Sequence, residues 1–431
     1  MAEDTRRSPE WVAPAAIVLF AFFFRLFLGR TFTYFGGDAP QYSRLGKNLA
    51  AGHGYSLAHA APYLASDVRL PAYPAVLALG YIFSHSAWSF IIVNSVLGAV
   101  STYLVWLIAK GVGLSRTRSL WSMGIAAVLL STATIAGIAQ SESLSIPAVL
   151  AFVYVVLIHP PAKLWALFVF GSLLAWLLAL TRDEMLFFVV IVAMVAARRA
   201  GLKLLASVAL VVCFVLGSAA WTLRNEVQVH RVELVDRLMT DGVLVSSVNG
   251  NLAAFPYRDF GVPLRAPQVA PAERAHLNHI ADTYVKNRLE HHLPAVVQSK
   301  VKYFLQSVFP VPIYGVSYVS TSDLLGRLVW SLITLAAYLM AIINSRIWWR
   351  SGRKRQLVSI LIFPVFILIF ELIFDPQARF VMPADVIILP LVVDGFATIV
   401  GNERAKWATA KKGPPPAPAD DRLSEATPSR P

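Results

Sequence analysis

A short polar segment, Gly37-Asp38-Ala39-Pro40-Gln41-Tyr42, directly follows the first long apolar run of the chain. A carboxylate here stands just outside the hydrocarbon of a membrane, where a lipid head group and a water-soluble molecule can meet. A positioned carboxylate can accept the proton of an attacking hydroxyl, so we interpret Asp38 as the catalytic centre of a membrane enzyme. Asp before Ala39-Pro40 is also typical of a helix N-cap, and the two roles are compatible.

Further charged residues are expected at the same outer surface. They are Asp67, Arg69, Glu142, Arg182, Asp183, Glu184, Asp375 and Arg379. Charges near a bilayer are costly, so those retained there usually have partners or functions. Simpler interpretations stay open. Arg182 could form an interfacial ion pair with Asp183 or Glu184, and Glu142 could be an acid at a helix N-terminus, where the helix dipole favours a negative charge. Arg25, inside the first apolar run, is expected to extend toward the outer head groups.

These residues must be positioned by membrane helices. Of the 431 residues, 57% are hydrophobic and 15% are charged, which excludes an ordinary soluble domain. Runs of about 16 to 24 apolar residues are long enough to cross the hydrocarbon as helices, which satisfy their own backbone hydrogen bonds. The sequence therefore predicts an all-α polytopic membrane protein with about ten transmembrane helices.

The ten predicted spans are separated by short loops. They cover residues 11–29, 87–109, 119–139, 143–158, 163–180, 184–197, 202–222, 324–344, 357–374 and 380–400. A first outer loop, 30–86, carries two juxtamembrane helices, over 39–51 and 70–84. A long outer segment before the eighth span contains one amphipathic helix, over 272–292.

Four regions follow from this order. Residues 1–222 form a seven-helix transmembrane module that includes the first outer loop, and 223–322 form the outer segment. Residues 323–400 carry the last spans, and 401–431 form a disordered tail on the inner side. The net charge of +13 lies mostly in short loops on one side, as the positive-inside rule requires, so nucleic acid is not an expected partner.

The main alternative is a transporter or flippase for a lipid-linked or small substrate. It would require ionisable residues at mid-membrane and paired broken helices, and the sequence predicts neither. Asp385 and Asp394 are its best support. A non-catalytic scaffold would leave the outer acids and arginines unexplained. Phosphate-binding and dinucleotide-binding glycine motifs are absent from the sequence, so nothing supports a soluble nucleotide-sugar site.

An ordered set of motifs resembles the GT-C membrane glycosyltransferases, in the branch of protein O-mannosyltransferases and the aminoarabinose transferase. The motifs lie within residues 11 to 400. They are Gly37 to Tyr42 with Leu45, Asn48, Leu49 and Gly52; Arg69 to Pro74; Ser141 to Leu144; Leu180 to Arg182; Ala220 to Asn225; and Ala378 to Pro383.

The resemblance implies a sugar donor carried on a polyprenyl phosphate, and an extracytoplasmic acceptor that is a glycolipid, a polysaccharide or a protein. It implies that Asp38 is catalytic. A lipid-phosphate leaving group needs cations, and Arg69, Arg182 and Arg379 are expected at the depth where they can bind its oxygens. Tyr42 is predicted to bind the donor with them, and Glu142, Asp67 and Asp183 are predicted as supporting acids. That branch often has a second acid after the catalytic one, where this chain has Ala39, so a divalent metal is possible but not assigned. The implied location is a bacterial inner membrane, with the site facing outward.

Overall fold

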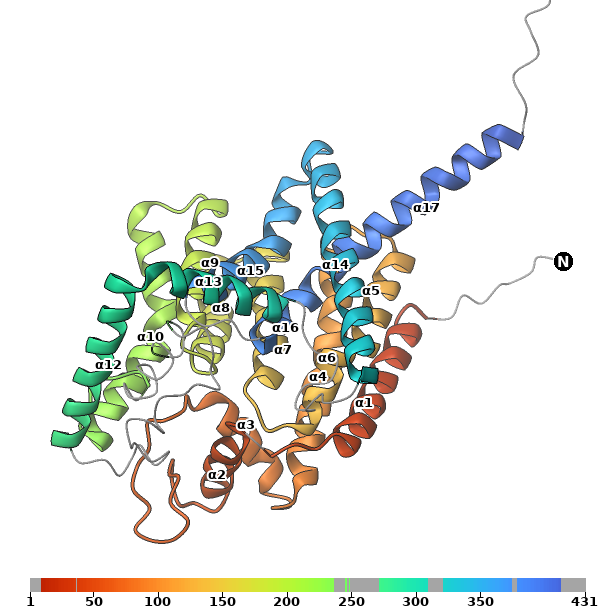
Figure 1. The fold of residues 1–431 in the computed structure, drawn as a ribbon. Coiled ribbons are helices and arrows are strands. Elements are labelled where there is room, and N and C mark those ends of the chain that lie inside the picture. The colour runs from red at the N-terminus through yellow and green to blue at the C-terminus, as the bar shows by residue number, and fades with distance from the viewer. Residues whose placement is uncertain are drawn as a thin grey trace, which may run out of the picture.

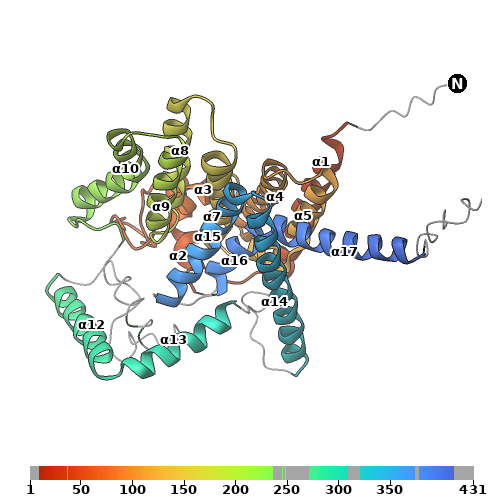
Figure 2. The same ribbon diagram turned by 90° about the horizontal axis from the view of Figure 1, so that it is seen from above.

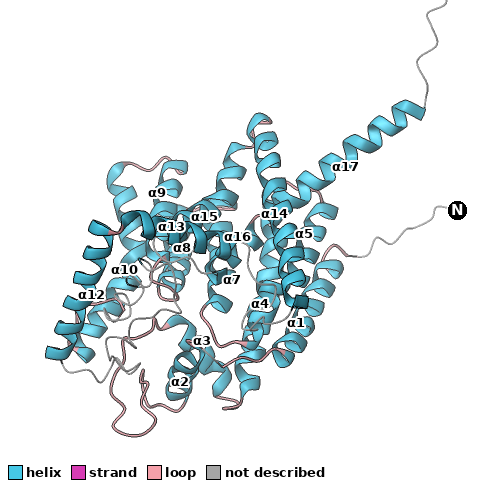
Figure 3. Cartoon of the chain, in the orientation of Figure 1, coloured by secondary structure: helices cyan, strands magenta, loops and turns pink. Residues whose placement is uncertain are grey.

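The computed structural model describes residues 9–35, 37–235, 245, 248, 271–308, 321–373 and 378–411. This part of the chain is helical and contains no β-strand, apart from one isolated bridge between Tyr34 and Ile138 (Figure 3). The predicted all-α class is therefore confirmed. Figure 1 shows most helices side by side, with the first outer loop at one end of the bundle.

The first layer of the bundle consists of α1 (Val12–Thr31), α4 (Ala87–Gly111) and α5 (Arg116–Val128), which contact one another. A short helix, α6 (Leu130–Ala133), and a 3-10 turn, η1 (Thr134–Gly137), continue α5 and pack against α1. Gly137 permits this contact because a Cβ there would stand 2.6 Å from the carbonyl oxygen of Phe32.

A second group packs beside the first through α7 (Glu142–Val153), which ends in a π-helical turn, η2 (Tyr154–Ile158). The group contains α8 (Leu164–Ala179), α9 (Met185–Arg199) and α10 (Leu204–Val229). α7 is buried along almost all of its length and contacts α4, α8 and α16. The largest apolar cluster surrounds it and includes Phe152, Phe188 and Phe363.

The C-terminal part comprises α12 (Pro271–His291), α13 (Leu293–Val308), α14 (Thr321–Arg350), α15 (Lys354–Ile373), α16 (Ala378–Ile387) and α17 (Leu389–Lys411). The predicted amphipathic helix corresponds to α12, whereas α13 is a second helix that the sequence did not predict. Figure 2 shows α12 and α13 along one edge of the molecule. α17 continues past the predicted end of the last span, and residues 412–431 lie outside the described part.

Each of the ten predicted spans coincides with a helix or with a bent pair of helices. Within the described residues, five helices are long and apolar enough to cross a membrane, or seven if each bent pair is one span. The remaining three predicted spans, α7 with η2, α8 and α9, are shorter. The chain is therefore a polytopic membrane protein, and the full count of ten stays a prediction.

Two spans are broken, which the sequence analysis did not expect. Arg116–Val128 and Leu130–Gly137 are bent by 56°, and Val381–Ile387 and Leu389–Gly401 by 41°. Ionisable side chains also lie inside spans: Arg25 in α1 is buried, and Tyr338 donates a hydrogen bond to Asp385 at 2.9 Å. Broken spans and buried ionisable side chains are therefore present, so the prediction that they are absent was wrong and does not count against a transporter.

Asp394, on α17, is the centre of a polar cluster that we call the inner cluster. Its carboxylate accepts hydrogen bonds from Trp348 Nε1 at 2.7 Å and Asn344 Nδ2 at 3.3 Å. It also pairs with Arg118 of α5 and, at 3.6 Å, with Arg353 from the loop after α14. Arg353 in turn stacks 3.7 Å from the ring centroid of Trp348. The inner cluster thus joins α5, α14 and α17.

Candidate active site

The loop that carries Asp38 is shaped by Gly37, whose φ of +60° favours glycine. The helix α2 (Ala39–Ala50) begins directly afterwards, with Asp38 at its N-cap position. The Asp38 side chain makes no capping hydrogen bond, although its backbone carbonyl accepts from the amides of Gln41 and Tyr42. The carboxylate is therefore not used to cap the helix.

Asp38 instead pairs with Arg69, 31 residues further along the chain. Arg69 Nη2 lies 2.5 Å from Asp38 Oδ1, and Arg69 Nε donates to Gln41 Oε1 at 2.7 Å. The guanidinium also lies 5.4 Å from the ring centroid of Tyr42. The side chains of Asp38 and Arg69 are 23% and 17% exposed, so a ligand can reach both.

The backbone around Arg69 is held by a second set of contacts. The Tyr55 hydroxyl approaches the carbonyls of Arg69 and Leu70 at 2.8 and 3.0 Å, and its ring packs edge-on against Trp221 of α10. Arg224, also on α10, donates to the carbonyl of Ser66 at 2.7 Å. Just beyond α10, Arg231 pairs with Asp67 at 2.9 Å. The first outer loop is therefore braced by the end of α10.

Tyr42 connects this loop to the turn before α7. Its buried ring meets Tyr73 of α3 (Ala72–Tyr81) edge-on, with centroids 5.3 Å apart. Burial raises the pKa of the Tyr42 hydroxyl, and the charge of Arg69 lowers it. The negative charges of Asp38 and Glu142 raise the same pKa, which shows that both lie near this hydroxyl. Tyr73 donates to Asn94 Oδ1 at 3.0 Å, and the Asn94 amide donates to the carbonyl of Ile138 at 2.9 Å. Asp38 and Glu142 therefore belong to one connected region.

Glu142 begins α7 and lies in a buried triad with Arg182 and Glu184. Arg182 Nη1 donates to Glu142 Oε1 at 2.7 Å, and its Nε bonds to Glu184. One guanidinium cannot neutralise two carboxylates. Burial raises the pKa of Glu184 to about 7, although Arg182 lowers it. With Glu184 protonated, the triad is close to neutral.

The structure brings some of the predicted site residues together and separates others. Asp38, Tyr42 and Arg69 are in direct contact, and Glu142 contacts Arg182. Asp67 is buried against Arg231, while Asp183 is exposed at the surface. Arg379 lies in α16, and its side chain is outside the described part of the structure.

Several residues in this region were not predicted. Gln41 and Arg224 lie inside motifs used for the resemblance, so those motifs were the available signal. Glu184 was placed at the outer surface only as a partner of Arg182. Tyr55 and Arg231 had no signal, because each makes its contact through the folded loop rather than by local spacing.

The described residues do not form a metal site. They contain no group of three His, Cys, Asp or Glu side chains that could hold a metal ion. Asp38, Asp67 and Glu142, the acids that could serve as ligands, each face an arginine instead. Ala39 supplies no second carboxylate next to Asp38.

No family model and no curated protein matches this sequence. Among solved structures, the chain is similar to the oligosaccharyltransferase AglB of Archaeoglobus fulgidus in complex with an inhibitory peptide and a dolichol-phosphate. The TM-score is 0.50 at 11% identity, over 95% of this chain and 53% of that one. The same oligosaccharyltransferase in its apo form matches with a TM-score of 0.46 at 12% identity, over 93% and 52%.

ArnT from Cupriavidus metallidurans, bound to undecaprenyl phosphate, matches with a TM-score of 0.37 at 14% identity, over 90% of this chain and 78% of that one. The match to AglB shows that the chain has the GT-C fold of membrane glycosyltransferases. The chain spans about half the length of AglB.

Proposed function

We propose that this protein is a membrane glycosyltransferase that takes a sugar from a polyprenyl-phosphate donor. The acceptor is a glycolipid, a polysaccharide or a protein outside the cytoplasm. The observation that carries the proposal is the partly exposed Asp38–Arg69 pair, at the point where the first outer loop leaves the apolar bundle. There a carboxylate that can accept a proton lies beside a guanidinium that can bind phosphate.

The fold supports this substrate class. AglB, which shares the fold, has been solved with a dolichol-phosphate, and that ligand is a polyprenyl phosphate. A donor of this kind has its chain in the bilayer and its phosphate at the surface, which is the depth expected for the first outer loop. The exposed apolar faces of the spans can hold the isoprenoid chain.

The reaction we propose is an in-line displacement at the anomeric carbon. The acceptor hydroxyl attacks this carbon and transfers its proton to Asp38, while the bond to the phosphate oxygen breaks. Polyprenyl phosphate leaves with the bonding electron pair, so no general acid is needed, and the anomeric configuration inverts. Arg69 stabilises the phosphate as its negative charge grows.

The three predicted arginines differ in how readily they can bind this phosphate. Arg69 is partly exposed, and a phosphate that bound it would also release Asp38 from its ion pair. Arg182 is 8% exposed and already bonded to two carboxylates, so a phosphate would have to compete with both. We therefore assign the donor phosphate first to Arg69, and keep Arg379 as a second candidate from its place at the start of α16.

We propose that the site faces outward across a bacterial inner membrane, with the inner cluster on the cytoplasmic side. Single cysteines at His59 and Ser351, in a Cys213→Ser background, test this arrangement because both positions are exposed. A membrane-impermeant reagent should label position 59 from outside, and position 351 only after permeabilisation. The reverse pattern would invert the topology.

The test of the function is an assay with purified enzyme. It should transfer sugar from one member of a panel of polyprenyl-phosphate sugars and from no nucleotide sugar alone, and Asp38→Asn should abolish this transfer. The acceptor can be found by comparing envelope glycolipids and glycoproteins with and without the gene by mass spectrometry. Turnover of a nucleotide sugar without any lipid carrier would overturn the donor assignment.

The second candidate is a transporter or flippase for a lipid-linked substrate. The two broken spans and the Tyr338–Asp385 pair favour it, because such features often line transport sites. Reconstitution of the protein with a fluorescent polyprenyl-phosphate sugar separates the candidates. Translocation that requires Asp385 and occurs without sugar transfer would replace the enzyme by the transporter.

A further inference from the structure

Arg25 is buried inside α1, with 2% of its surface exposed. Its guanidinium donates to the carbonyl of Ala126 at 2.9 Å and to that of Ala127 at 3.1 Å. The expected extension toward the head groups was therefore wrong. A buried arginine in a membrane span is costly, so its interactions must offset a considerable penalty.

The two carbonyls that bind Arg25 are those released by the break after α5. α5 ends at Val128, and Leu129 adopts an extended backbone with ψ of 105°. In an unbroken helix Ala126 and Ala127 would accept hydrogen bonds from the amides of residues 130 and 131. Arg25 replaces those two donors, so it caps the end of α5 from a neighbouring helix.

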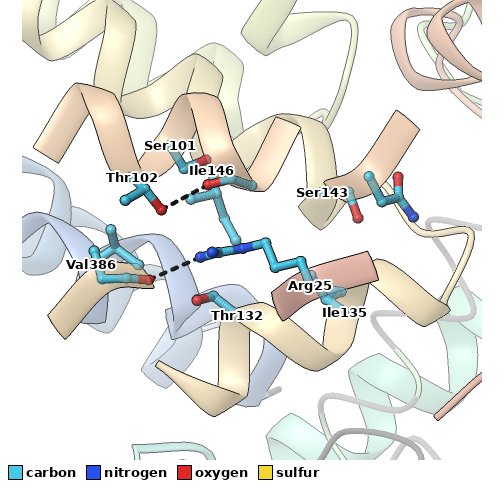
Figure 4. Close-up of a pocket in the computed structure, with 11 residues that line it drawn as sticks. Arg25, Ser101, Thr102, Thr132, Ile135, Ser143, Ile146 and Val386 are labelled. Atoms are coloured by element: carbon cyan, nitrogen blue, oxygen red, sulfur yellow. Dashed lines mark hydrogen bonds between the residues drawn. The ribbon is translucent and has the colours of Figure 1, made fainter. Parts of the chain in front are cut away.

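A small cavity adjoins the Arg25 side chain, where both broken spans meet. It is lined by Ala126 and Thr132 from the first broken span and by Val386 from the second. Figure 4 shows the guanidinium between Thr102 and Thr132, close to Val386. Pro390, four residues after Val386, has no N–H to continue the helix, which fits the break in the second span.

The hydrogen-bond directions define what the cavity can hold. The hydroxyls of Ser101, Thr102 and Thr132 each donate to a backbone carbonyl of their own helix or turn, so their oxygen lone pairs remain as acceptors. Arg25 Nε is buried and has no hydrogen-bond partner. The Ser143 hydroxyl also lines the cavity and can donate or accept, so a water molecule, which does both, suits this set of groups. The cavity volume of about 10 Å³ is near the lower limit for one water.

We propose that Arg25 is a positioning residue, which with one bound water fixes the break between α5 and α6. The break directs the chain through η1, which packs on α1, and then into the turn that ends at Glu142. This turn also meets the segment before Asp38, since the backbone amide of Tyr34 donates to the carbonyl of Gly137 at 3.0 Å. The role in positioning Glu142 rests on the proposed function. The cap that Arg25 forms on α5, which we call the clamp, and its bound water do not.

Gly98 of α4 provides a test that leaves Arg25 in the sequence. A Cβ at Gly98 would stand 2.3 Å from both Cδ and Nε of Arg25, so Gly98→Ala must displace the guanidinium. Gly124, in the middle of α5, has open space around its Cβ position. Gly124→Ala is therefore the matched control, on the helix whose end is capped.

Hydrogen exchange of the full-length protein in detergent should show directly the loss of the hydrogen bonds from Arg25 to the end of α5. Peptides that cover residues 129–133 should exchange about tenfold or more faster in Arg25→Met and Gly98→Ala, and Arg25→Lys should recover part of the protection. The double variant should add little to Arg25→Met, because both changes remove the same contacts. Unchanged exchange in both single variants, or equal acceleration in Gly124→Ala, would overturn the clamp.

Two further measurements test the water and the positioning role. An experimental map should show one water within hydrogen-bond distance of Arg25 Nε; an anomalous signal there after bromide exchange would replace the water by an anion. The pH–rate profile of transfer should shift on its acidic side in Arg25→Lys, because Glu142 moves relative to Asp38. A profile that is only scaled down would refute positioning, whereas absent transfer in the wild type would refute the proposed function and leave the exchange result valid.

Discussion

The two ends of this molecule each centre on an aspartate, but the two residues are held differently. Asp394 in the inner cluster is 7% exposed and receives four side chains from α5, α14 and the following loop. Asp38 lies at the start of a loop helix and is 23% exposed, as part of a pair whose arginine is also partly exposed. A carboxylate surrounded by fixed donors stabilises helix packing, whereas one in an accessible pair can exchange its partner for a substrate.

The largest effect that this comparison predicts is on turnover at the outer end. Asp38→Asn should lower the rate by about 10²–10⁴-fold or more, because the amide cannot accept the acceptor's proton. Thermal unfolding should stay near that of the wild type, since the side chain is partly exposed and caps no helix. Glu226→Gln, at an exposed acid of α10, is the control; near-normal turnover in Asp38→Asn would remove Asp38 from the mechanism.

Asp394→Ala should lower stability and leave turnover unchanged, which is the opposite of Asp38→Asn. It leaves Arg118, Arg353, Trp348 and Asn344 without their shared acceptor. Because both arginines are partly exposed, we expect a loss of about 1–3 kcal/mol in unfolding free energy. Thermal unfolding in detergent measures the loss, and turnover per folded molecule should be retained.

The control for that variant is Glu10→Gln, which removes an exposed pair with Lys110 at 3.9 Å and should cost about 0–1 kcal/mol. Equal stability of Asp394→Ala and Glu10→Gln would show that the inner cluster does not hold the helices together.

Arg69→Lys should act on the donor rather than on the fold. A lysine offers a compact charge in place of a forked guanidinium that also bonds Gln41, so the donor KM should rise about tenfold. The KM of the acceptor should change little. Arg30→Lys, on the exposed end of α1, is the control. An unchanged donor KM would move the phosphate to Arg379.

The smallest effect concerns pH. Because burial raises the pKa of Glu184 to about 7 from an ordinary value of 4.5, the folded protein binds a proton more tightly than the unfolded chain. This group therefore favours folding at low pH, and its contribution declines as the pH rises from about 4.5 to about 7. Glu184→Gln should flatten that part of the stability profile, and Glu290→Gln, at an exposed acid of α12, should not. A profile that stays unchanged in Glu184→Gln would reject the raised pKa.

The sequence was informative where local patterns carry the structure. Apolar runs located the helices. The expected positions of charged residues relative to the membrane placed Asp38, Arg69, Glu142 and Arg182 at one surface, and the structure shows the pairs Asp38–Arg69 and Glu142–Arg182. The sequence could not show that Asp67 belongs to Arg231, because the two are 164 positions apart and share no periodicity.

The two helix breaks differ in whether a local sequence signal marks them. The second lies just before Leu389-Pro390, so a local signal was present and was not used. The first lies within Val128-Leu129-Leu130, a run without proline or glycine that is compatible with a continuous helix. Its cause is the distant Arg25, which supplies hydrogen bonds that local sequence does not provide.

The bracing of the first outer loop by α10 also has a consequence for biosynthesis. Asp38, Tyr42 and Arg69 leave the ribosome early, yet the contacts to Ser66 and Asp67 come from Arg224 and Arg231, made 158 and 164 positions later. Until α10 has entered the membrane, the nascent loop lacks these two anchors. The site is therefore completed late, so intermediates that have inserted only the first helices carry every residue of the Asp38 pair without the support that orients it.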